Sequence, residues 1–266
     1  MERQLERPLV TVIVPAHNAS HYICRALDSV YEQEGEFTVE LFVINDASTD
    51  DTAKVIEAYK QEKSGIETVE KDRVFCDMRY WTNEKNLGVA ETRNRGIRAA
   101  KGRYIAFLDA DDWWQANKLR RQLELMQTHD AVLCATGREL MRPDGSTTGK
   151  VIGIPAEITY DMLLRTNSIP CSAVLLKTEV AQEFLMCHDE WHEDYILWLK
   201  ILKKYGNAYG LNEPMLKSRL SEGGKSRNKI KSAKMQFGVY RLMGYGVIRS
   251  SYYFVQYAIN GVKKYR

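Results

Sequence analysis

Apolar runs of strand length alternate with segments of helical periodicity in the first half of the chain, which limits the folds that it can adopt. The predicted strands lie at 9–14, 40–44, 103–108 and 131–135, and the predicted helices at 23–31, 55–59, 89–100 and 115–128. Strands that are joined by helices become parallel neighbours, and a parallel sheet is covered on both faces. The pattern therefore predicts an α/β fold with a mostly parallel sheet and helices on both sides.

The second half of the chain is less regular. A charged stretch at 66–81 carries one short strand within a long loop, and the later predicted elements are a turn at 143–146, a strand at 172–176, a helix at 194–205 and two helical pieces from about 229. We expect one domain over 1–220, divided into halves at about 8–112 and 113–220, and a helical C-terminal extension over 221–266.

Composition excludes several classes of protein. Hydrophobic residues make up 44% of the 266 residues and charged residues 27%, as in ordinary soluble domains. The five cysteines are scattered and never form a CxxC pair, which favours reduced thiols over disulfides or a zinc site. No apolar run has the length of a membrane span, and the first eight residues are charged. We expect a cytoplasmic protein.

Charge is distributed unevenly along the chain. Residues 217–266 hold twelve Lys and Arg and one acidic residue, whereas residues 1–216 hold 26 basic and 34 acidic residues. Eight aromatic residues fall within 237–266. A basic, aromatic, amphipathic helix is typical of segments that lie on a membrane surface, which is the interpretation we favour. The alternatives are packing on the body or in an oligomer, and nucleic-acid binding, which we do not expect.

Polar side chains follow three of the predicted strands. The first strand runs into Pro15-Ala16-His17-Asn18, the second into Asn45-Asp46 and the third into Asp109-Ala110-Asp111-Asp112. The carboxyl ends of parallel strands form the edge where such sheets bind ligands. Asp109 and Asp111 point to the same side of an extended segment, and Mg²⁺ or Mn²⁺ would relieve their repulsion. Alternatively, Asp112 caps the next helix and the other two are solvated.

Two common phosphate-binding motifs are missing. No GxGxxG follows the first strand, which argues against a dinucleotide site, and no GxxxxGK[ST] occurs, which argues against a P-loop. Any nucleotide is therefore held in another way.

Five motifs in this order resemble those of the family 2 glycosyltransferases, which have the GT-A fold. They lie at 12–18, 45–50, 86–96, 107–114 and 193–199, and the resemblance covers residues 8–205. It implies a nucleotide-diphosphate sugar as donor, most often a UDP-sugar, bound by the first half of the domain with Mn²⁺ or Mg²⁺ as cofactor. The second half then binds the acceptor.

The resemblance also implies roles for individual residues. Asp46 matches the acid that contacts uracil, Asp109 and Asp111 form the DxD motif that meets ribose, metal and diphosphate, and Asp194 matches the catalytic base, with Glu193 beside it. The remaining matched residues of the donor site are Pro15, Ala16, Asn18, Asn86, Arg93 and Ala110. The chain departs from the family pattern at His17, Asn45 and Thr92. Asn45 stands where the family has an acid beside the position that contacts the nucleobase, so the nucleobase of the donor stays open.

Inverting transfer needs a carboxylate that accepts the proton of the acceptor hydroxyl, which suits Asp194, and a stabilised diphosphate. Arg219, Lys225 and Arg227 flank a glycine pair at 223–224 and could contact that diphosphate. The plainer alternatives are a helix N-terminus for Glu193-Asp194 and a solvated basic tail for Lys225 and Arg227.

Residues 188–192 hold two histidines at zinc-protease spacing, but Asp189 stands where that signature needs Glu. We therefore assign Trp191 and His192 to the acceptor side rather than to a zinc site.

The basic tail resembles that of bacterial enzymes that build cell-wall or capsular polysaccharides on lipid carriers. This implies a glycan or lipid-linked saccharide as acceptor, a peripheral position on the inner face of the plasma membrane, and possible homodimers. Two rivals stay open: a nucleotidyltransferase, although the first strand lacks a basic glycine-rich signature, and a non-catalytic protein that binds a nucleotide sugar or glycan.

Overall fold

The computed structural model describes residues 9–63, 74–187, 192–220 and 229–265. The strands are β1 (Val10–Ala16), β2 (Thr38–Asn45), β3 (Phe75–Thr82), β4 (Tyr104–Phe107), β5 (Trp113–Trp114), β6 (Leu133–Met141), β7 (Thr147–Ile152), β8 (Glu157–Ile158), β9 (Val174–Lys177) and β10 (Ala208–Arg219). The helices are α1 (Ile23–Tyr31), α2 (Thr52–Lys63), α3 (Val89–Ala99), α4 (Lys118–Thr128), α5 (Tyr160–Arg165), α6 (Thr178–Glu183), α7 (Glu193–Tyr205), α8 (Lys229–Leu242) and α9 (Val247–Tyr265), with a short 3₁₀ helix at Cys171–Ala173.

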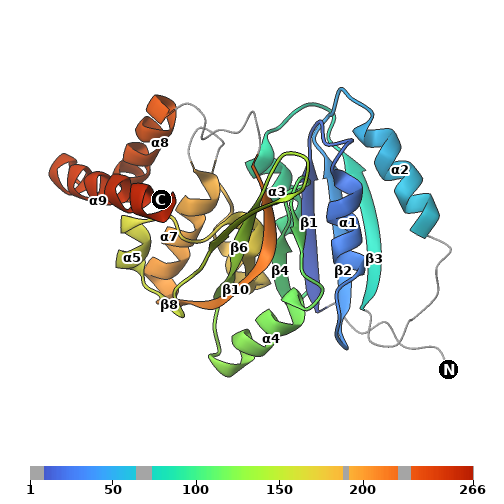
Figure 1. Cartoon of the computed structure of the whole chain (residues 1–266), viewed down its shortest axis with the longest axis horizontal. Helices are drawn as coiled ribbons and strands as arrows, with labels where there is room; N and C mark the ends of the chain where they lie inside the picture. The colour runs from blue at the N-terminus through green and yellow to red at the C-terminus, as the bar shows by residue number, and fades with distance from the viewer. Residues whose placement is uncertain (1–8, 64–73, 188–191, 221–228, 266) are drawn as a thin grey trace.

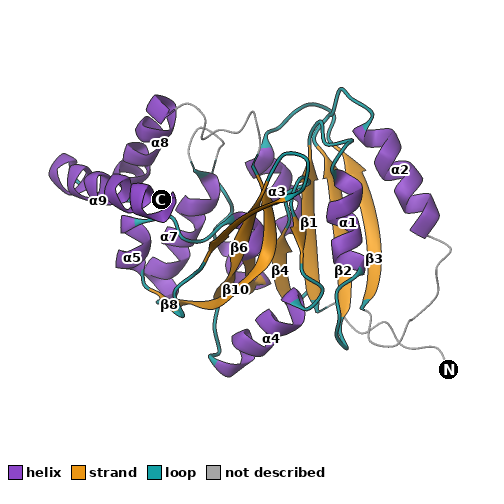
Figure 2. Ribbon diagram, viewed as in Figure 1, coloured by secondary structure: helices purple, strands orange, loops and turns teal. Residues whose placement is uncertain are grey.

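One sheet runs through the molecule in the order β3-β2-β1-β4-β9-β6-β10-β5, with β7 beside β6 and β8 beside β10 (Figures 1 and 2). The four strands from β3 to β4 are parallel. Strand β9 is antiparallel to both β4 and β6, while β6 and β10 are again parallel. The predicted α/β fold is confirmed. The first four of the five sequence motifs belong to the half of the sheet in which all strands are parallel.

Strand β1 separates two hydrophobic cores because its side chains alternate between the faces of the sheet. Val12 and Val14 belong to the core beneath α1, α2 and α4, whereas Ile13 belongs to the core beneath α3, α6 and α7. All three side chains are fully buried, and each contributes roughly 1.5–3 kcal/mol through the burial of its apolar surface. This double burial explains why the strand reads as an unbroken apolar run.

Helix α3 lies unusually close to β1 because Gly96 faces the strand. A Cβ atom at Gly96 would lie 2.8 Å from Cγ2 of Ile13, closer than real side-chain contacts come. The missing side chain therefore allows the close approach. The same helix carries Arg93, so this contact helps to set the position of that side chain in the site.

Strands β3 and β10 are among those that differ from the sequence-based expectation. The short strand expected within 66–81 is an eight-residue edge strand, Phe75–Thr82, whose charged outward residues hide its period. Strand β10 was not predicted at all, because Pro214 interrupts its pattern. In the structure, the pairing of β10 with β6 shifts register between Leu211 and Leu216, so the proline sits in an irregularity that spares the ladder.

The C-terminal helices dock onto the end of α5, at the edge of the molecule farthest from β3 (Figure 1). Three successive carbonyl groups of α5 each accept a hydrogen bond from a different helix: Leu163 from the Tyr195 hydroxyl, Leu164 from the Tyr240 hydroxyl and Arg165 from the Asn260 amide. These donors reach carbonyls near the end of a helix, where intrahelical partners run out, although the carbonyl of Leu163 also accepts the backbone N–H of Thr166. Val239 and Tyr240 join the core that contains α7. One part of the aromatic cluster thus packs on the body. In the described part of the chain, no helix is long and apolar enough to cross a bilayer.

Candidate functional site

The loops after β1 and β2 are tied together by Asn18. Its side-chain Oδ1 accepts a hydrogen bond from the backbone N–H of Thr49 at 2.8 Å, and its own N–H donates to the Ser48 hydroxyl at 3.0 Å. Asn18 has a φ of 51°, a left-handed conformation that asparagine tolerates better than most residues. The structure therefore gives Asn18 a loop-joining contact at the edge where the sequence placed it.

Asn45 closes the turn that follows β2. Its Oδ1 accepts hydrogen bonds from the backbone N–H of Ser48 at 3.0 Å and from the Ser48 hydroxyl at 2.6 Å. Its Nδ2 donates to the Tyr80 hydroxyl at 3.4 Å. The amide of Asn45 thus links the turn to β3.

Asp46 is buried and holds the loop that leads into α3. Its carboxylate accepts hydrogen bonds from the backbone N–H groups of Leu87 at 2.8 Å and Gly88 at 2.9 Å, and from the Asn83 amide at 2.8 Å. Asp46 is only 3% exposed. A nucleobase that contacted Asp46 would therefore share its carboxylate with three hydrogen-bond donors of the protein.

Asn83 is a buried partner that the sequence-based reasoning missed. Besides Asp46, its Nδ2 reaches the Thr92 hydroxyl at 3.0 Å, and its Oδ1 accepts from Arg95 at 2.6 Å. The signal was present, because Asn83 directly follows the end of a parallel strand. The residue pattern does not reveal this position, because the charged stretch that contains β3 resembles a loop.

His17 lies exposed at the rim of these loops. Its Nδ1 is 2.8 Å from the carbonyl oxygen of Asp46, so Nδ1 carries the proton and donates it to that oxygen. Its Nε2 lies 3.3 Å from Nδ2 of Asn86. The structure thus brings His17 and Asn86 together, and Pro15 and Ala16 lie buried at the end of β1.

The DxD segment follows β4. The Asp109 side chain is 37% exposed, and its backbone N–H donates to the Ser172 hydroxyl at 3.0 Å. Burial, together with the charge of Asp109, raises the pKa of Asp111 to about 6. Ala110 lies buried between them. The pair concentrates negative charge at the carboxyl edge of the sheet.

Asp112 is more deeply buried than Asp109 and Asp111. It is 7% exposed, and its Oδ1 accepts a hydrogen bond from the backbone N–H of Arg219 at 2.9 Å. Burial raises the pKa of its carboxyl well above the usual range, and the charges of Asp109 and Asp111 add to the shift. The expectation that it caps the next helix is wrong, because α4 begins at Lys118 with Asn117 in the cap position. Asp112 instead fastens the end of β10 to the DxD segment.

Arg93 is the central side chain of the site. It is 4% exposed; its Nη2 donates to Oδ1 of Asp109 at 2.5 Å and its Nη1 to Oε1 of Glu193 at 3.2 Å. The guanidinium therefore connects the DxD segment after β4 with the first turn of α7. Motif spacing placed Arg93 beside the donor site but did not reveal this second partner.

Glu193 and Asp194 open α7 and differ in their surroundings. Glu193 is 7% exposed and engaged by Arg93, whereas Asp194 is half-buried and its Oδ1 accepts from the backbone N–H of Tyr195 at 2.7 Å. Burial, followed by the charge of Glu193, raises the pKa of Asp194 to about 7, while Arg93 opposes the shift. A carboxylate with such a pKa is a strong enough base to accept a proton near neutral pH.

Arg219 lies next to the DxD segment. Its Nε donates to the carbonyl oxygen of Asp111 at 3.0 Å, its Nη1 donates to that of Pro143 at 2.5 Å, and its guanidinium lies 4.6 Å from the ring of Tyr22. A second cation, Arg25, lies 3.5 Å above the ring of Trp113 in the same region. Nothing in the residue pattern points to Arg25, because it occupies an ordinary position on α1.

Three predicted residues, Trp191, Lys225 and Arg227, lie outside the described residues. His192 precedes α7 as its N-cap residue and is half-buried, and its carbonyl oxygen accepts the N–H of Ile196 at 3.0 Å.

Asp109 and Asp111 suit a hard divalent cation. Among the described residues, no group of three or more His, Cys, Asp or Glu side chains is arranged to hold a metal. Two carboxylates with partly open surroundings nevertheless fit Mg²⁺ or Mn²⁺, which take the rest of their ligands from water and substrate phosphates.

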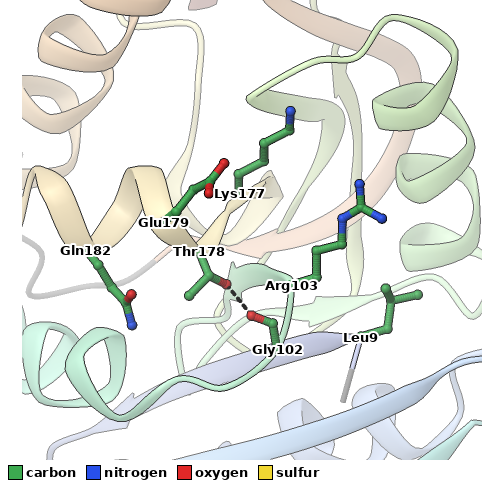
Figure 3. A pocket seen from close by; sticks show the side chains of 7 residues that line it. All are labelled: Leu9, Gly102, Arg103, Lys177, Thr178, Glu179 and Gln182. Carbon is green, nitrogen blue, oxygen red and sulfur yellow. Dashed lines mark hydrogen bonds between the residues drawn. The ribbon is translucent and has the colours of Figure 1, made fainter. Parts of the chain in front are cut away.

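A cavity of about 520 Å³ lies at the start of β4, at the other end of that strand from the DxD segment. Figure 3 shows the side chains that line it. Gly102 and Arg103, which precede β4, line it together with Leu9, Lys177, Thr178, Glu179 and Gln182. Asp109 follows the other end of β4. The cavity therefore belongs to a different part of the molecule from the carboxylates.

Comparison with known proteins gives the family. Residues 11–173 match the model of Glycosyl transferase family 2. The chain is 37% identical over 259 residues to the putative teichuronic acid biosynthesis glycosyltransferase TuaG of Bacillus subtilis, covering 97% of this chain and 98% of that protein. It is 35% identical over 262 residues to WfgD of Escherichia coli, a UDP-Glc:alpha-D-GlcNAc-diphosphoundecaprenol beta-1,3-glucosyltransferase, covering 97% and 95% of the two chains.

Solved structures share the fold. TarS of S. aureus in complex with UDP-GlcNAc superposes with a TM-score of 0.70 at 17% identity, covering 94% of this chain and 71% of that one. The mannosyltransferase PcManGT of Pyrobaculum calidifontis, in complex with GDP-Man and Mn²⁺, gives 0.68 at 19% identity, covering 94% and 70%. The GT-A fold that the motifs implied is confirmed. With its family model matched over most of the sheet and its relatives aligned from end to end, the chain belongs to glycosyl transferase family 2 and is a glycosyltransferase.

Proposed function

We propose that this glycosyltransferase transfers a sugar from a UDP-sugar to a hydroxyl group of a lipid-linked glycan, with inversion and with the help of a divalent cation, in the synthesis of a bacterial surface polysaccharide. The observation that carries the proposal is the bridge through Arg93, which sets the DxD carboxylates beside the Glu193–Asp194 pair. The activities for which TuaG and WfgD are named support the pathway and the acceptor class.

Asp194 is the proposed general base. Arg93 occupies Glu193 and neutralises it, which leaves Asp194 as the more accessible carboxylate of the pair. Its Oδ1 accepts the N–H of Tyr195, and we assign the other oxygen to accept the proton of an acceptor hydroxyl. In-line attack from the side of Asp194 on a donor held at Asp109 would invert the anomeric centre.

Asp109 and Asp111 would hold Mn²⁺ or Mg²⁺. Held there, the cation would supply Lewis-acid stabilisation to the negative charge of the departing diphosphate. The protein itself supplies positive charge close by, from Arg93 on Asp109 and from Arg219 beside Asp111. His17, Asn86 and Asn18 surround the region proposed for the nucleoside. An acceptor carried on a lipid would confine the enzyme to a membrane surface.

Calorimetric titration with UDP, GDP and dTDP, each with and without Mn²⁺, tests the donor site. We expect UDP to bind in the presence of Mn²⁺ and the Asp111→Ala variant to lose that binding. Asp77→Ala is the matched control, since Asp77 is a half-exposed aspartate on the edge strand β3. PcManGT binds GDP-Man, and a preference of this chain for GDP would overturn the choice of uracil as the nucleobase of the donor. Equal loss in both variants would overturn the role of Asp111.

Transfer assays with Asp194→Asn separate an enzyme from a non-catalytic binding protein. The variant should keep donor binding and lose turnover. A wild-type protein that binds UDP-sugar but transfers nothing to any glycan acceptor in the presence of Mn²⁺ would favour the binding protein.

A further inference from the structure

Helix α9 has two apolar faces, and only one of them is packed. On the inner face, Ser250 is fully buried, the ring of Tyr253 lies 5.8 Å from that of Tyr240, and the ring of Tyr257 lies 6.4 Å from that of Tyr195. The outer face carries five exposed apolar residues, which we call the α9 stripe: Ile248 (88% exposed), Tyr252 (51%), Val255 (54%), Ile259 (46%) and Val262 (57%). Their spacing of four and three residues places them in one line along the helix.

The stretch of sequence that contains the α9 stripe is basic and holds no acidic residue. Residues 229–266 contain eight Lys and Arg and no Asp or Glu. Arg241 and Arg249 are both exposed. A helix with an apolar face, and with basic but no acidic residues in its own sequence, matches the surface of an anionic bilayer, in which such helices bury their apolar face by about 5–10 Å. Tyr252 suits this depth, because its ring is apolar and its hydroxyl reaches water.

A second copy of the chain is a poorer partner for the α9 stripe. In a pair of helices joined along it, the flanking positions would be Arg249, Gln256 and Lys263 on one side and Ser251 and Ala258 on the other. These positions offer no opposite charges, whereas paired helices use them for salt bridges. The stripe also spans only about two heptads, which is short for a stable pair.

We infer that the α9 stripe is a docking surface for an anionic membrane, with Ile248, Tyr252, Val255, Ile259 and Val262 seated among the lipid headgroups. The inner face of α9 contacts Tyr195, which directly follows Asp194 on α7. Docking therefore holds the helix of the proposed base close to the bilayer. The inference rests on the proposed function for its purpose, delivery of a lipid-linked acceptor, but not for the binding itself.

Flotation of the full-length protein with vesicles tests the inference. We expect binding to vesicles of phosphatidylcholine mixed with phosphatidylglycerol, weak binding to phosphatidylcholine alone, and weakening by salt. The triple variant Ile248→Ser, Val255→Ser, Ile259→Ser should bind at least about tenfold more weakly, because it removes apolar groups that enter the interface. Val255→Ser and Val151→Ser form a matched pair, since both valines are 54% exposed. Only the first should weaken binding.

Two results would overturn the inference. One is equal binding of the wild type and the triple variant to anionic vesicles. The other is a dimer, measured by light scattering without lipid, that the triple variant dissociates, since the stripe would then belong to a second copy. Calorimetry with UDP and Mn²⁺ on the same samples keeps the two proposals apart. Vesicle binding without nucleotide binding would count against the proposed donor, and nucleotide binding without vesicle binding would count against the α9 stripe.

Discussion

Arg93 and Glu193 form a buried ion pair across 100 residues of sequence, with Nη1 of the arginine 3.2 Å from Oε1 of the glutamate. The other end of the guanidinium lies 2.5 Å from Asp109. One cation thus serves carboxylates from the two halves of the domain. Its burial makes it costly to remove, because the carboxylates would be left facing one another.

Replacing Arg93 tests this dependence. Arg93→Met should lower the free energy of unfolding by about 3–5 kcal/mol, the usual cost of leaving one partner of a buried pair alone. Adding Glu193→Gln should restore part of the loss, since it removes one of the two stranded charges. Urea unfolding of the single and double variants measures both effects. If the double variant were no more stable than Arg93→Met, the two side chains would not be coupled.

Removing the carboxylate of Asp194 should separate catalysis from binding. Asp194→Asn should reduce kcat by about 10²–10⁴-fold, the usual contribution of a general base, and leave the Kd for the donor nucleotide unchanged. Single-turnover transfer rates and calorimetry give the two quantities. A fall in kcat of less than fivefold would assign the proton transfer to another group.

The activity should depend on pH through Asp194. The folded-state pKa is raised to about 7, so the carboxylate is mostly protonated below that pH and cannot accept a proton. We expect kcat/KM to rise tenfold per pH unit below about 7 and to level off above it. A rate profile across this range in a buffer of constant ionic strength provides the measurement. A flat profile down to pH 5 would contradict the raised pKa.

The same shift predicts a change in stability. The folded state holds the Asp194 proton more tightly than the unfolded state, in which the pKa is near the ordinary value of 3.8. Its contribution to stability is therefore lost as pH rises from about 4 through about 7. Asp194→Asn should raise the urea midpoint at pH 8 relative to wild type and leave it nearly unchanged at pH 4. A variant less stable than wild type at pH 8 would show that the charged form is not strained.

The close contact of α3 with β1 can be tested at Gly96. Gly96→Ala places a methyl group 2.8 Å from Ile13, and overpacking of this kind costs about 1–3 kcal/mol. Gly261 in α9 is the matched control, because a Cβ there meets nothing within 4 Å. Gly261→Ala should stabilise by up to about 1 kcal/mol through helix propensity. Thermal unfolding of both variants distinguishes a steric effect from a general effect of alanine.

Local pattern was sufficient where each element satisfies its needs along its own sequence. Strand β1 and helix α1 could be predicted from the sequence. Burial on both faces of the strand requires a continuous apolar run, and burial of one face of the helix requires apolar residues at helical spacing. The polar residues at strand ends were readable for the same reason, since a parallel sheet sends them all to one edge. Strand β10 could not be predicted from the sequence. Its proline is tolerated because the pairing with β6 is irregular there, and that irregularity is a property of the two strands together.

The sequence by itself determined the fold class and the family, because these follow from short motifs in a given order, and the same motifs predicted Asp109, Asp111 and Asp194 as the carboxylates of the site. The tertiary structure decided how those groups are divided. Asp112 turned to β10, Asp46 to the loop before α3, and Glu193 to Arg93, which leaves Asp194 as the more accessible partner. It also decided which face of α9 is packed. Burial and charge pairing depend on neighbours far away in the chain, and the spacing of residues along the sequence does not reveal them.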